Sequence, residues 1–387
     1  MKILRVKFDN IIIFNEPFDI DFTAPDKIME SSGVYKVWSA VNTQQTISII
    51  GINAAGKTTS LRLLNLAMEV VLNNKGLNEN LVPSIFLNKE TEKDGVIMTV
   101  YFYKGNRVFE LRSEIKYRDI DGGVHFYYED EVLKSKAKSN VTSKNNIFDF
   151  TENENYKVVR RNEIAKESLK FLKDDVSIAI TETRDSEVTI NTMLDDVKDK
   201  INYIQGVVDT NILNVFDENI KRLGKIDEGG DFEVEFENSQ IKIQSHILAL
   251  GEIVSSGTIR GQKIIKNAII ALKSGGYLII DELENHLNKE LVKMIINIFN
   301  NKEINKKGAC LIFTTHYAEI LDSFDRMDNI YILVRTKNHF TKVHRYSEMV
   351  ERSELKKSEV ILSNYIKGTA PKASSIKSLE EYICNMI

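Results

Sequence analysis

A glycine-rich loop constrains this chain more than any other feature. Residues 51–58 read GINAAGKT, the G-x-x-x-x-G-K-T pattern of a phosphate-binding loop. The apolar run 46–50 before it is typical of a buried strand, and apolar side chains recur at helical spacing over 61–71. Strand, glycine loop and helix form the setting in which backbone N–H groups and a helix N-terminus bind phosphate. A glycine turn that matches by accident is the alternative, and the flanking elements argue against it.

This loop predicts a site for ATP and Mg²⁺. Lys57 is expected to reach the β- and γ-phosphates, and the Thr58 hydroxyl to bind magnesium. The other loop residues that we expect to contact the nucleotide are Gly51, Asn53, Ala54, Ala55, Gly56 and Thr59.

Two further apolar strands end in residues suited to ATP hydrolysis. Residues 276–282, GYLIIDE, have the form of a Walker B motif, in which Asp281 holds magnesium and Glu282 polarises the attacking water. Residues 312–316, IFTTH, place His316 where it can touch the γ-phosphate. A lone histidine after a strand is usually an ordinary surface residue, but its position after the acid-bearing strand and helix favours the functional interpretation.

A serine–glycine segment decides the class. Residues 254–258, VSSGT, precede a predicted helix and lie about 25 residues before Asp281, so Ser255, Ser256 and Gly257 could form an anion site. For this segment alone a simple helix cap is the better interpretation. Its place between the phosphate loop and the acid pair, with the histidine last, is what favours a nucleotide-binding role.

Composition and periodicity limit the architecture. The 387 residues suffice for two domains or one large domain with an insertion, and the net charge of −4 does not indicate nucleic acid. Cys310 and Cys384 form no redox or metal pattern, and neither a secretion signal nor an apolar stretch of about 18 residues is present. We therefore expect a cytoplasmic protein with no membrane partner. Alternation predicts antiparallel strands in 2–22 and a single strand at 231–237, and further strands are expected at 96–103 and 108–115. The helix–strand alternation after 257 predicts a parallel sheet flanked by helices.

In order and spacing, the four motifs resemble those of ABC-type ATPases, over residues 1–75 and the C-terminal half. The chain is similar to the heads of structural-maintenance-of-chromosomes (SMC) proteins and, more closely, to the ATPase domains of overcoming-lysogenization-defect (OLD) nucleases. The segment 254–258 departs from the transporter form LSGGQ, and 283–288, LENHLN, replaces the transporter proline and D-loop; both look OLD-like. No Q-loop glutamine is recognisable between the phosphate loop and residue 254.

This resemblance implies an α/β fold. It is the ABC-ATPase head, a P-loop NTPase with a mixed sheet flanked by helices and an N-terminal antiparallel β-subdomain, plus an inserted helical region. The expected division is 1–120 for the N-terminal part of the head, 121–225 for a mostly helical inserted lid, 226–345 for the C-terminal part of the head and 346–387 for a helical tail.

The resemblance also implies partners. In such ATPases the signature segment binds the γ-phosphate of nucleotide held by a second subunit, so Ser255, Ser256 and Gly257 would act across a head-to-head homodimer or higher even oligomer. Only 71 residues (387 − 316) follow His316, too few for a fused Toprim nuclease domain. The expected function is a slow, regulatory ATPase that assembles with a separately encoded nuclease or Toprim-like effector in anti-phage defence.

Several alternatives stay open. A DNA-binding or repair ATPase of SMC type, acting without an effector, would use the lysines in 134–144 together with Arg160 and Arg161, which otherwise form a solvated, mobile surface. A transporter subunit has no supporting feature. The acids Asp322, Asp325 and Asp328 could suggest a metal site, although a solvated turn is the better interpretation. The remaining histidines of the C-terminal third, for which we expect structural roles, are His286, His339 and His344.

Overall fold

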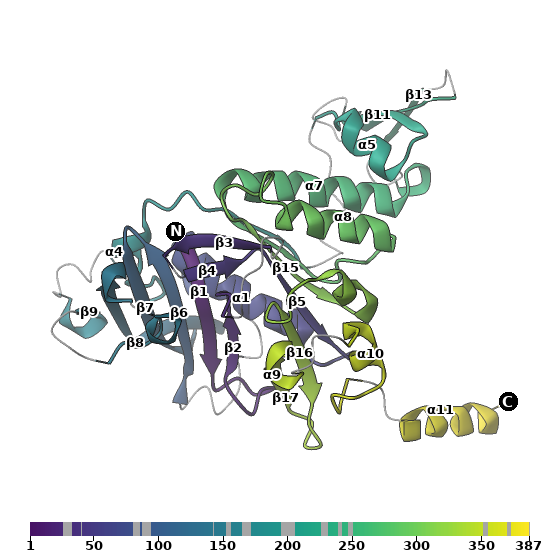
Figure 1. Ribbon diagram of the computed structural model, residues 1–387. Helices are drawn as coiled ribbons and strands as arrows, with labels where there is room; N and C mark the ends of the chain where they lie inside the picture. Colours follow the sequence, from purple (N-terminus) through teal and green to yellow (C-terminus); the bar gives the residue numbers. More distant parts are fainter. Residues whose placement is uncertain are drawn as a thin grey trace.

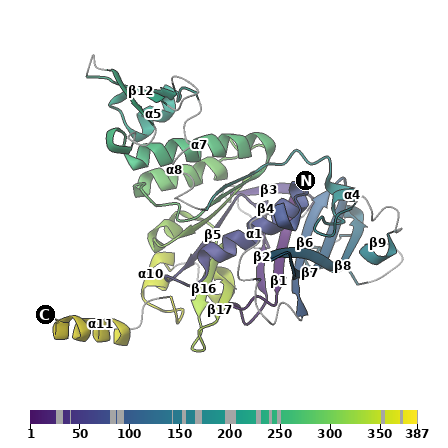
Figure 2. The same ribbon diagram turned by 180° about the vertical axis from the view of Figure 1, so that it is seen from behind.

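Two six-stranded sheets pack on opposite sides of helix α1, Lys57–Leu72 (Figures 1 and 2). The computed structural model describes residues 1–25, 33–39, 41–79, 86, 94–141, 143–151, 156–164, 172–194, 206–225, 231–238, 242–246, 251–350, 355–369 and 373–386. Apolar side chains of both sheets pack against α1. Leu64 and Met68 of the helix share one buried cluster with Ile49 of one sheet and Phe102 of the other. A helix that is apolar all round is stable only when buried in this way.

One sheet is parallel except at its last strand, and it carries the motifs. Its order is β10-β14-β15-β5-β16-β17. The strands are β10 Ile190–Met193, β14 Tyr277–Ile280, β15 Cys310–Thr315, β5 Thr46–Gly51, β16 Ile330–Arg335 and β17 Thr341–Arg345. Strands β5, β14 and β15 are almost wholly buried, as expected for parallel strands covered on both faces. Because these three strands are parallel, their carboxyl ends meet at one edge of the sheet.

Two helices cover the face of this sheet that α1 leaves open. They are α7 Ser256–Ser274 and α8 Lys289–Asn300, which lie side by side in Figures 1 and 2. Ile264 of α7 and Ile296 of α8 pack in one cluster with Ile280 and Phe313 of the sheet. The helix–strand alternation predicted after residue 257 is confirmed, and it places the N-terminus of α7 near the motif-bearing edge.

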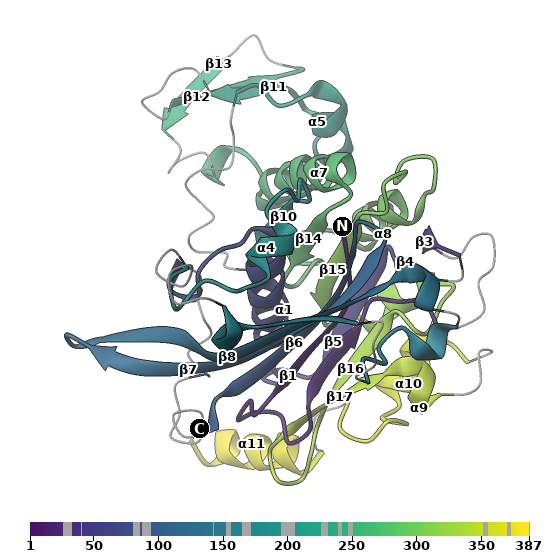
Figure 3. The ribbon, with the colours of Figure 1, turned by 90° about the vertical axis from the view of Figure 1, so that its left-hand side faces the viewer.

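The second sheet is antiparallel and has the order β2-β1-β6-β7-β8-β9. Its strands are β1 Lys2–Asp9, β2 Phe18–Asp21, β6 Val96–Lys104, β7 Arg107–Ile120, β8 Gly123–Ala137 and β9 Lys157–Arg160. The antiparallel strands predicted in 2–22 are confirmed by the pairing of β1 with β2. The strands predicted at 96–103 and 108–115 are β6 and β7, which also pair antiparallel. The β7–β8 hairpin extends away from the body of the protein (Figure 3). A separate short hairpin joins β3 Val34–Trp38 to β4 Val41–Gln44.

The region 121–225 is not mostly helical in its described part. Strands β8, β9, β10 and β11 Ile220–Lys225 lie there, against two short α-helices, α4 Ile180–Thr183 and α5 Thr210–Phe216. Residues 165–171 and 195–205 of the expected helical stretch lie outside the described residues. The prediction failed because alternate side chains of β8, such as Phe126 and Tyr128, are buried against the sheet, and this two-residue period outweighs the charge pattern.

A small unit packs on α7. Strands β11, β12 Asp231–Phe236 and β13 Lys242–His246 form an antiparallel sheet that, with α5, encloses a core of its own (Figures 1 and 3). The strand predicted at 231–237 is confirmed as β12. Val254, the first residue of the serine–glycine segment, belongs to this core. The chain closes with α9 Tyr346–Met349, α10 Lys357–Leu362 and α11 Ala373–Met386, which stands away from the body (Figures 1 and 2). Across the described ranges no helix is long and apolar enough to cross a bilayer.

Candidate functional site

The phosphate loop lies between β5 and α1, at the carboxyl edge of the parallel sheet. Gly56 has a φ of 91° and Ala54 a φ of 58°, so the loop uses left-handed backbone twice. A Cβ at Gly51 would lie 2.9 Å from the carbonyl oxygen of Leu333, which explains the first glycine of the pattern. The whole of α1 is described, and neither a capping side chain nor an acid in its first turn competes with an anion at its N-terminus.

Lys57 crosses the inside of the loop. Its Nζ donates to the carbonyl oxygens of Gly51 at 2.9 Å and Ile52 at 3.2 Å, and lies 3.4 Å from Nδ1 of His316. Burial lowers the pKa of Lys57, and nearby carboxylates, first that of Asp281, oppose the shift. The ammonium group is therefore held over the position that the phosphate-loop pattern assigns to the β- and γ-phosphates.

Thr58 and Asp281 form the predicted magnesium pair. The Thr58 hydroxyl donates to Oδ2 of Asp281 at 2.5 Å, and the Thr314 hydroxyl donates to Oδ1 at 2.5 Å. The backbone N–H of Asp281 donates to the carbonyl oxygen of Met193 on β10 at 2.9 Å. A hydroxyl and a carboxylate side by side are the oxygen ligands that Mg²⁺ takes together with phosphate, so these residues fit the ion.

Glu282 and His316 face each other across the open side of the site. Oε1 of Glu282 lies 3.2 Å from Nε2 of His316, and the Glu282 side chain is 47% exposed. Its backbone has a φ of 49° and its N–H donates to the Thr314 hydroxyl at 2.8 Å. The N–H of His316 in turn donates to Oε1 of the buried Glu284 at 2.6 Å. Strained backbone held by hydrogen bonds is common at functional sites, because the surrounding structure fixes the side chain.

Arg260 supports the acid pair and was missed from the sequence. From α7 it donates to the carbonyl oxygens of Asp281 at 2.9 Å and Glu282 at 2.8 Å, with 9% of its surface exposed. It therefore joins the helix that begins with the serine–glycine segment to the loop that carries both acids. A single arginine inside a helical pattern gives no sequence signal for such a contact.

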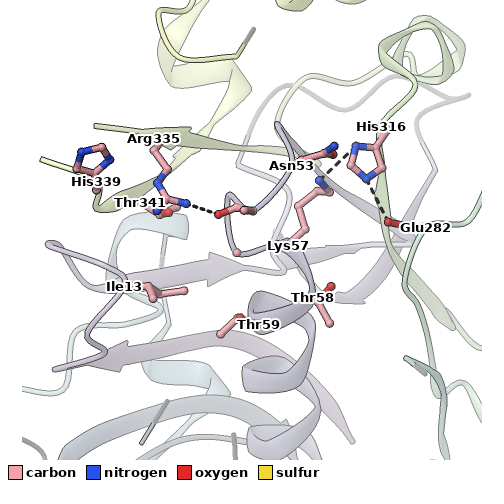
Figure 4. A pocket seen from close by; sticks show the side chains of 12 residues that line it. Ile13, Asn53, Lys57, Thr58, Thr59, Glu282, His316, Arg335, His339 and Thr341 are labelled. Atoms are coloured by element: carbon pink, nitrogen blue, oxygen red, sulfur yellow. Dashed lines mark hydrogen bonds and ion pairs between the residues drawn. The ribbon is translucent and has the colours of Figure 1, made fainter. Parts of the chain in front are cut away.

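Lys57, Thr58, Glu282 and His316 line one cavity of about 510 Å³. Its lining is Ile13, Asn53, Ala54, Gly56, Lys57, Thr58, Thr59, Glu282, His316, Arg335, His339 and Thr341. Figure 4 shows His316 and Glu282 on one side of the phosphate loop, and Arg335, Thr341 and His339 on the other. The second group was not predicted, and His339 had been assigned a structural role. These residues reach the cavity through the pairing of β16 with β5, which no local sequence pattern reveals.

The serine–glycine segment does not line this cavity. Ser255 caps α7, accepting from the N–H of Thr258 at 3.1 Å, while the Ser256 hydroxyl lies 3.1 Å from Nδ1 of His286. A Cβ at Gly257 would lie 2.6 Å from the carbonyl oxygen of His286, so only glycine allows this approach. Both serines are exposed. The helix cap is therefore present, and the same groups remain open to a ligand from outside the chain.

Comparison with known families agrees with this geometry. Residues 47–322, more than half of the 387, match the model of a family described as "AAA domain, putative AbiEii toxin, Type IV TA system". The chain belongs to this family. It is thus an AAA/ABC-type ATPase with a nucleotide-binding P-loop and mixed α/β sheets. No curated protein matches the chain significantly.

Three of the basic residues proposed as DNA contacts of this AAA-domain protein are engaged by other groups of the chain. Lys136 is 1% exposed, and its Nζ donates to the carbonyl oxygen of Asn146 at 2.7 Å. Arg161 is buried and donates to Oε2 of Glu131 at 2.6 Å. Lys134 lies on β8 within 3.6 Å of Oε1 of Glu110. For Lys136 and Arg161 the prediction of an exposed surface was wrong, because both side chains pack against the antiparallel sheet. Lys138, Lys144 and Arg160 are partly exposed.

Of the acidic residues after His316, Asp328 differs from expectation. Asp328 is fully buried in an ion pair with Arg326, and Asp322 accepts from the N–H of Ser358 at 2.9 Å and from its hydroxyl at 2.6 Å. Asp325 is exposed at a bend, which agrees with the expected solvated turn, and Asp322 is exposed as well. Among described residues no group of three histidine, cysteine or acidic side chains could hold a metal ion.

Proposed function

We propose that this AAA-domain protein is an ABC-type ATPase of the OLD-like kind that closes as a head-to-head dimer, or higher even oligomer, around ATP and Mg²⁺. The observation that carries the proposal is the position of the serine–glycine segment. Ser255 and Ser256 are exposed, and with Gly257 they lie outside the cavity that holds Lys57. A second copy can bring this segment over the open side of that cavity, so each nucleotide would be bound by residues of two chains.

The cavity supports slow hydrolysis. Glu282 accepts a proton from the attacking water, and His316, 3.2 Å from its carboxylate, orients it toward the γ-phosphate. Thr58 and Asp281 would hold magnesium, which supplies charge neutralisation between the phosphates. Because Arg260 joins α7 to the acid pair, movement of the serine–glycine segment on closure would change the backbone positions of Asp281 and Glu282.

We further propose that closure regulates a separately encoded nuclease or Toprim-like effector in anti-phage defence. Support comes from the resemblance to OLD-like ATPases and from the family description, which names a toxin and a toxin–antitoxin system. The DNA-binding alternative is weakened at Lys136 and Arg161, which are buried.

Co-expression with the product of the neighbouring gene tests the effector role. The two proteins should co-elute in size-exclusion chromatography with Mg-ATP. With the Lys57→Ala chain, the amount of effector that co-elutes should change. If the proteins elute separately with and without ATP, the effector role is wrong. The ATPase assignment is tested separately, by measuring phosphate release.

A further inference from the structure

The cavity has a second end that the four sequence motifs do not explain. Lys57, Glu282 and His316 lie at one end, and Arg335, His339, Thr341 and Ile13 line the other, across the phosphate loop (Figure 4). The phosphate chemistry needs only the first end. The second end comes from two separate segments, the β16–β17 hairpin and the loop between β1 and β2.

These two segments are locked to the phosphate loop. Arg335 donates to the carbonyl oxygen of Ala54, and the Thr341 hydroxyl donates to that of Ala55 at 3.0 Å. The N–H of Thr341 donates to the carbonyl oxygen of Ile13 at 2.7 Å. The far end of the cavity is therefore a built wall that shares hydrogen bonds with the loop expected to hold the phosphates.

His339 is fixed at the tip of that wall. The turn is closed by the N–H of Thr336 donating to the carbonyl oxygen of Phe340 at 2.8 Å, and by that of His339 donating to Thr336 at 3.1 Å. His339 has a φ of 65°, a left-handed conformation that costs energy for any residue with a Cβ. Glycine at this position would avoid the strain, but it would place no ring in the cavity lining.

We propose that the nucleoside part of the bound nucleotide lies at this end, with its base against the imidazole of His339 and the side chain of Ile13. This rests on the proposed nucleotide binding. The γ-phosphate belongs beside Lys57, Glu282 and His316, so the ribose and base must extend in the opposite direction along the loop. Within the same cavity, that direction ends at the wall formed by Ile13, Arg335 and His339. A flat ring and an apolar side chain suit a base plane.

Comparing ATP with inorganic tripolyphosphate tests the assignment, because the second ligand has no nucleoside. Affinities for both, with Mg²⁺, are measured by calorimetry on the full chain. In His339→Asn the new residue tolerates left-handed backbone but lacks the ring, and Ile13→Ser removes the apolar contact from the other segment. Each variant should lower the affinity for ATP about tenfold, since one base stack contributes about that much. The affinity for tripolyphosphate should not change. Lys337→Ala, on the same turn but outside the cavity lining, is the control and should change neither.

The outcomes separate this assignment from the proposed function. If His339→Asn and Ile13→Ser bind ATP as tightly as the wild type, the nucleoside lies elsewhere, and nucleotide binding itself stands. An equal loss for both ligands would place these residues at the phosphates and overturn the assignment. If the wild-type chain binds tripolyphosphate but gains nothing from the nucleoside of ATP, the assignment is also wrong. Failure of the wild type to bind either ligand would refute nucleotide binding, and with it this inference.

Discussion

The phosphate-loop cavity and the beginning of α7 are held in place by different kinds of contact. In the cavity, Lys57, Asp281 and His316 follow three adjacent strands of one sheet and form hydrogen bonds to neighbouring groups of the same chain. The serine–glycine segment begins with Val254, which is buried in the small unit of α5 and β11–β13. A rigid sheet thus presets the hydrolytic side chains. The segment expected to meet a second chain instead depends on packing against a peripheral unit, and Arg260 links its helix to the acid pair.

Removing the ammonium group of the cavity should have the largest effect. In Lys57→Ala the charge over the β- and γ-phosphates is lost, and we expect ATP affinity to fall on the order of 10²-fold or more. Calorimetry with Mg-ATP measures this. Lys75→Ala, an exposed lysine just beyond α1, is the matched control and should bind normally. Affinity of Lys57→Ala within threefold of the wild type would show that the cavity is not the nucleotide site.

Changing the acid that faces His316 should separate hydrolysis from binding. We expect Glu282→Gln to lower the rate of phosphate release by about 10²–10⁴-fold, because the general base is removed while the phosphate contacts stay. ATP affinity should remain within threefold of the wild type. Glu290→Gln on α8, exposed and remote from the cavity lining, provides the control. Turnover of Glu282→Gln at the wild-type rate would contradict the role given to Glu282.

A change at the other region should leave the cavity intact. A Cβ at Gly261 of α7 would lie 2.1 Å from the ring of Phe216 on α5, so Gly261→Ala must displace the small unit. We expect a loss of about 1–3 kcal/mol in the local stability of that unit, the usual cost of overpacking. Hydrogen exchange should quicken in α5 and β11, while ATP affinity stays unchanged.

The control for that variant is a second glycine. Gly251→Ala meets no atom within 4 Å and should leave exchange unaltered. A large fall in ATP affinity in Gly261→Ala would mean that the two regions are not separable, and the comparison drawn above would fail.

Features set by local sequence patterns were predictable, and features set by contacts between distant segments were not. That Lys57, Asp281, Glu282 and His316 lie close together could be predicted because each follows an apolar strand, and parallel strands bring their carboxyl ends to one edge. The two antiparallel stretches near the N-terminus were found from period-two alternation alone. The expected roles of Ser255, Ser256 and Gly257 toward a second chain stay predictions.

What was missed depends on contacts between distant segments. Arg260 and His339 reach the site through helix packing and through the pairing of β16 with β5, and neither leaves a local pattern. Strand β10 was hidden in a charged region, yet its Met193 holds the backbone of Asp281. Lys136 was taken as solvated because its neighbours in sequence are polar, whereas its burial is set by the sheet and by Phe150, over whose ring its Nζ lies at 4.4 Å.

Solution mass measured by light scattering, with and without Mg-ATP, tests the central claim most directly. In the Glu282→Gln background, where ATP is retained, the account predicts that the 44.3 kDa chain at least doubles its mass on adding nucleotide. Adding Ser256→Arg should prevent the doubling without weakening ATP binding, whereas Ser139→Arg, an exposed serine at the far sheet, should not prevent it. A mass that stays constant while ATP is bound, or that doubles equally with Ser256→Arg, would contradict a nucleotide site shared between two chains.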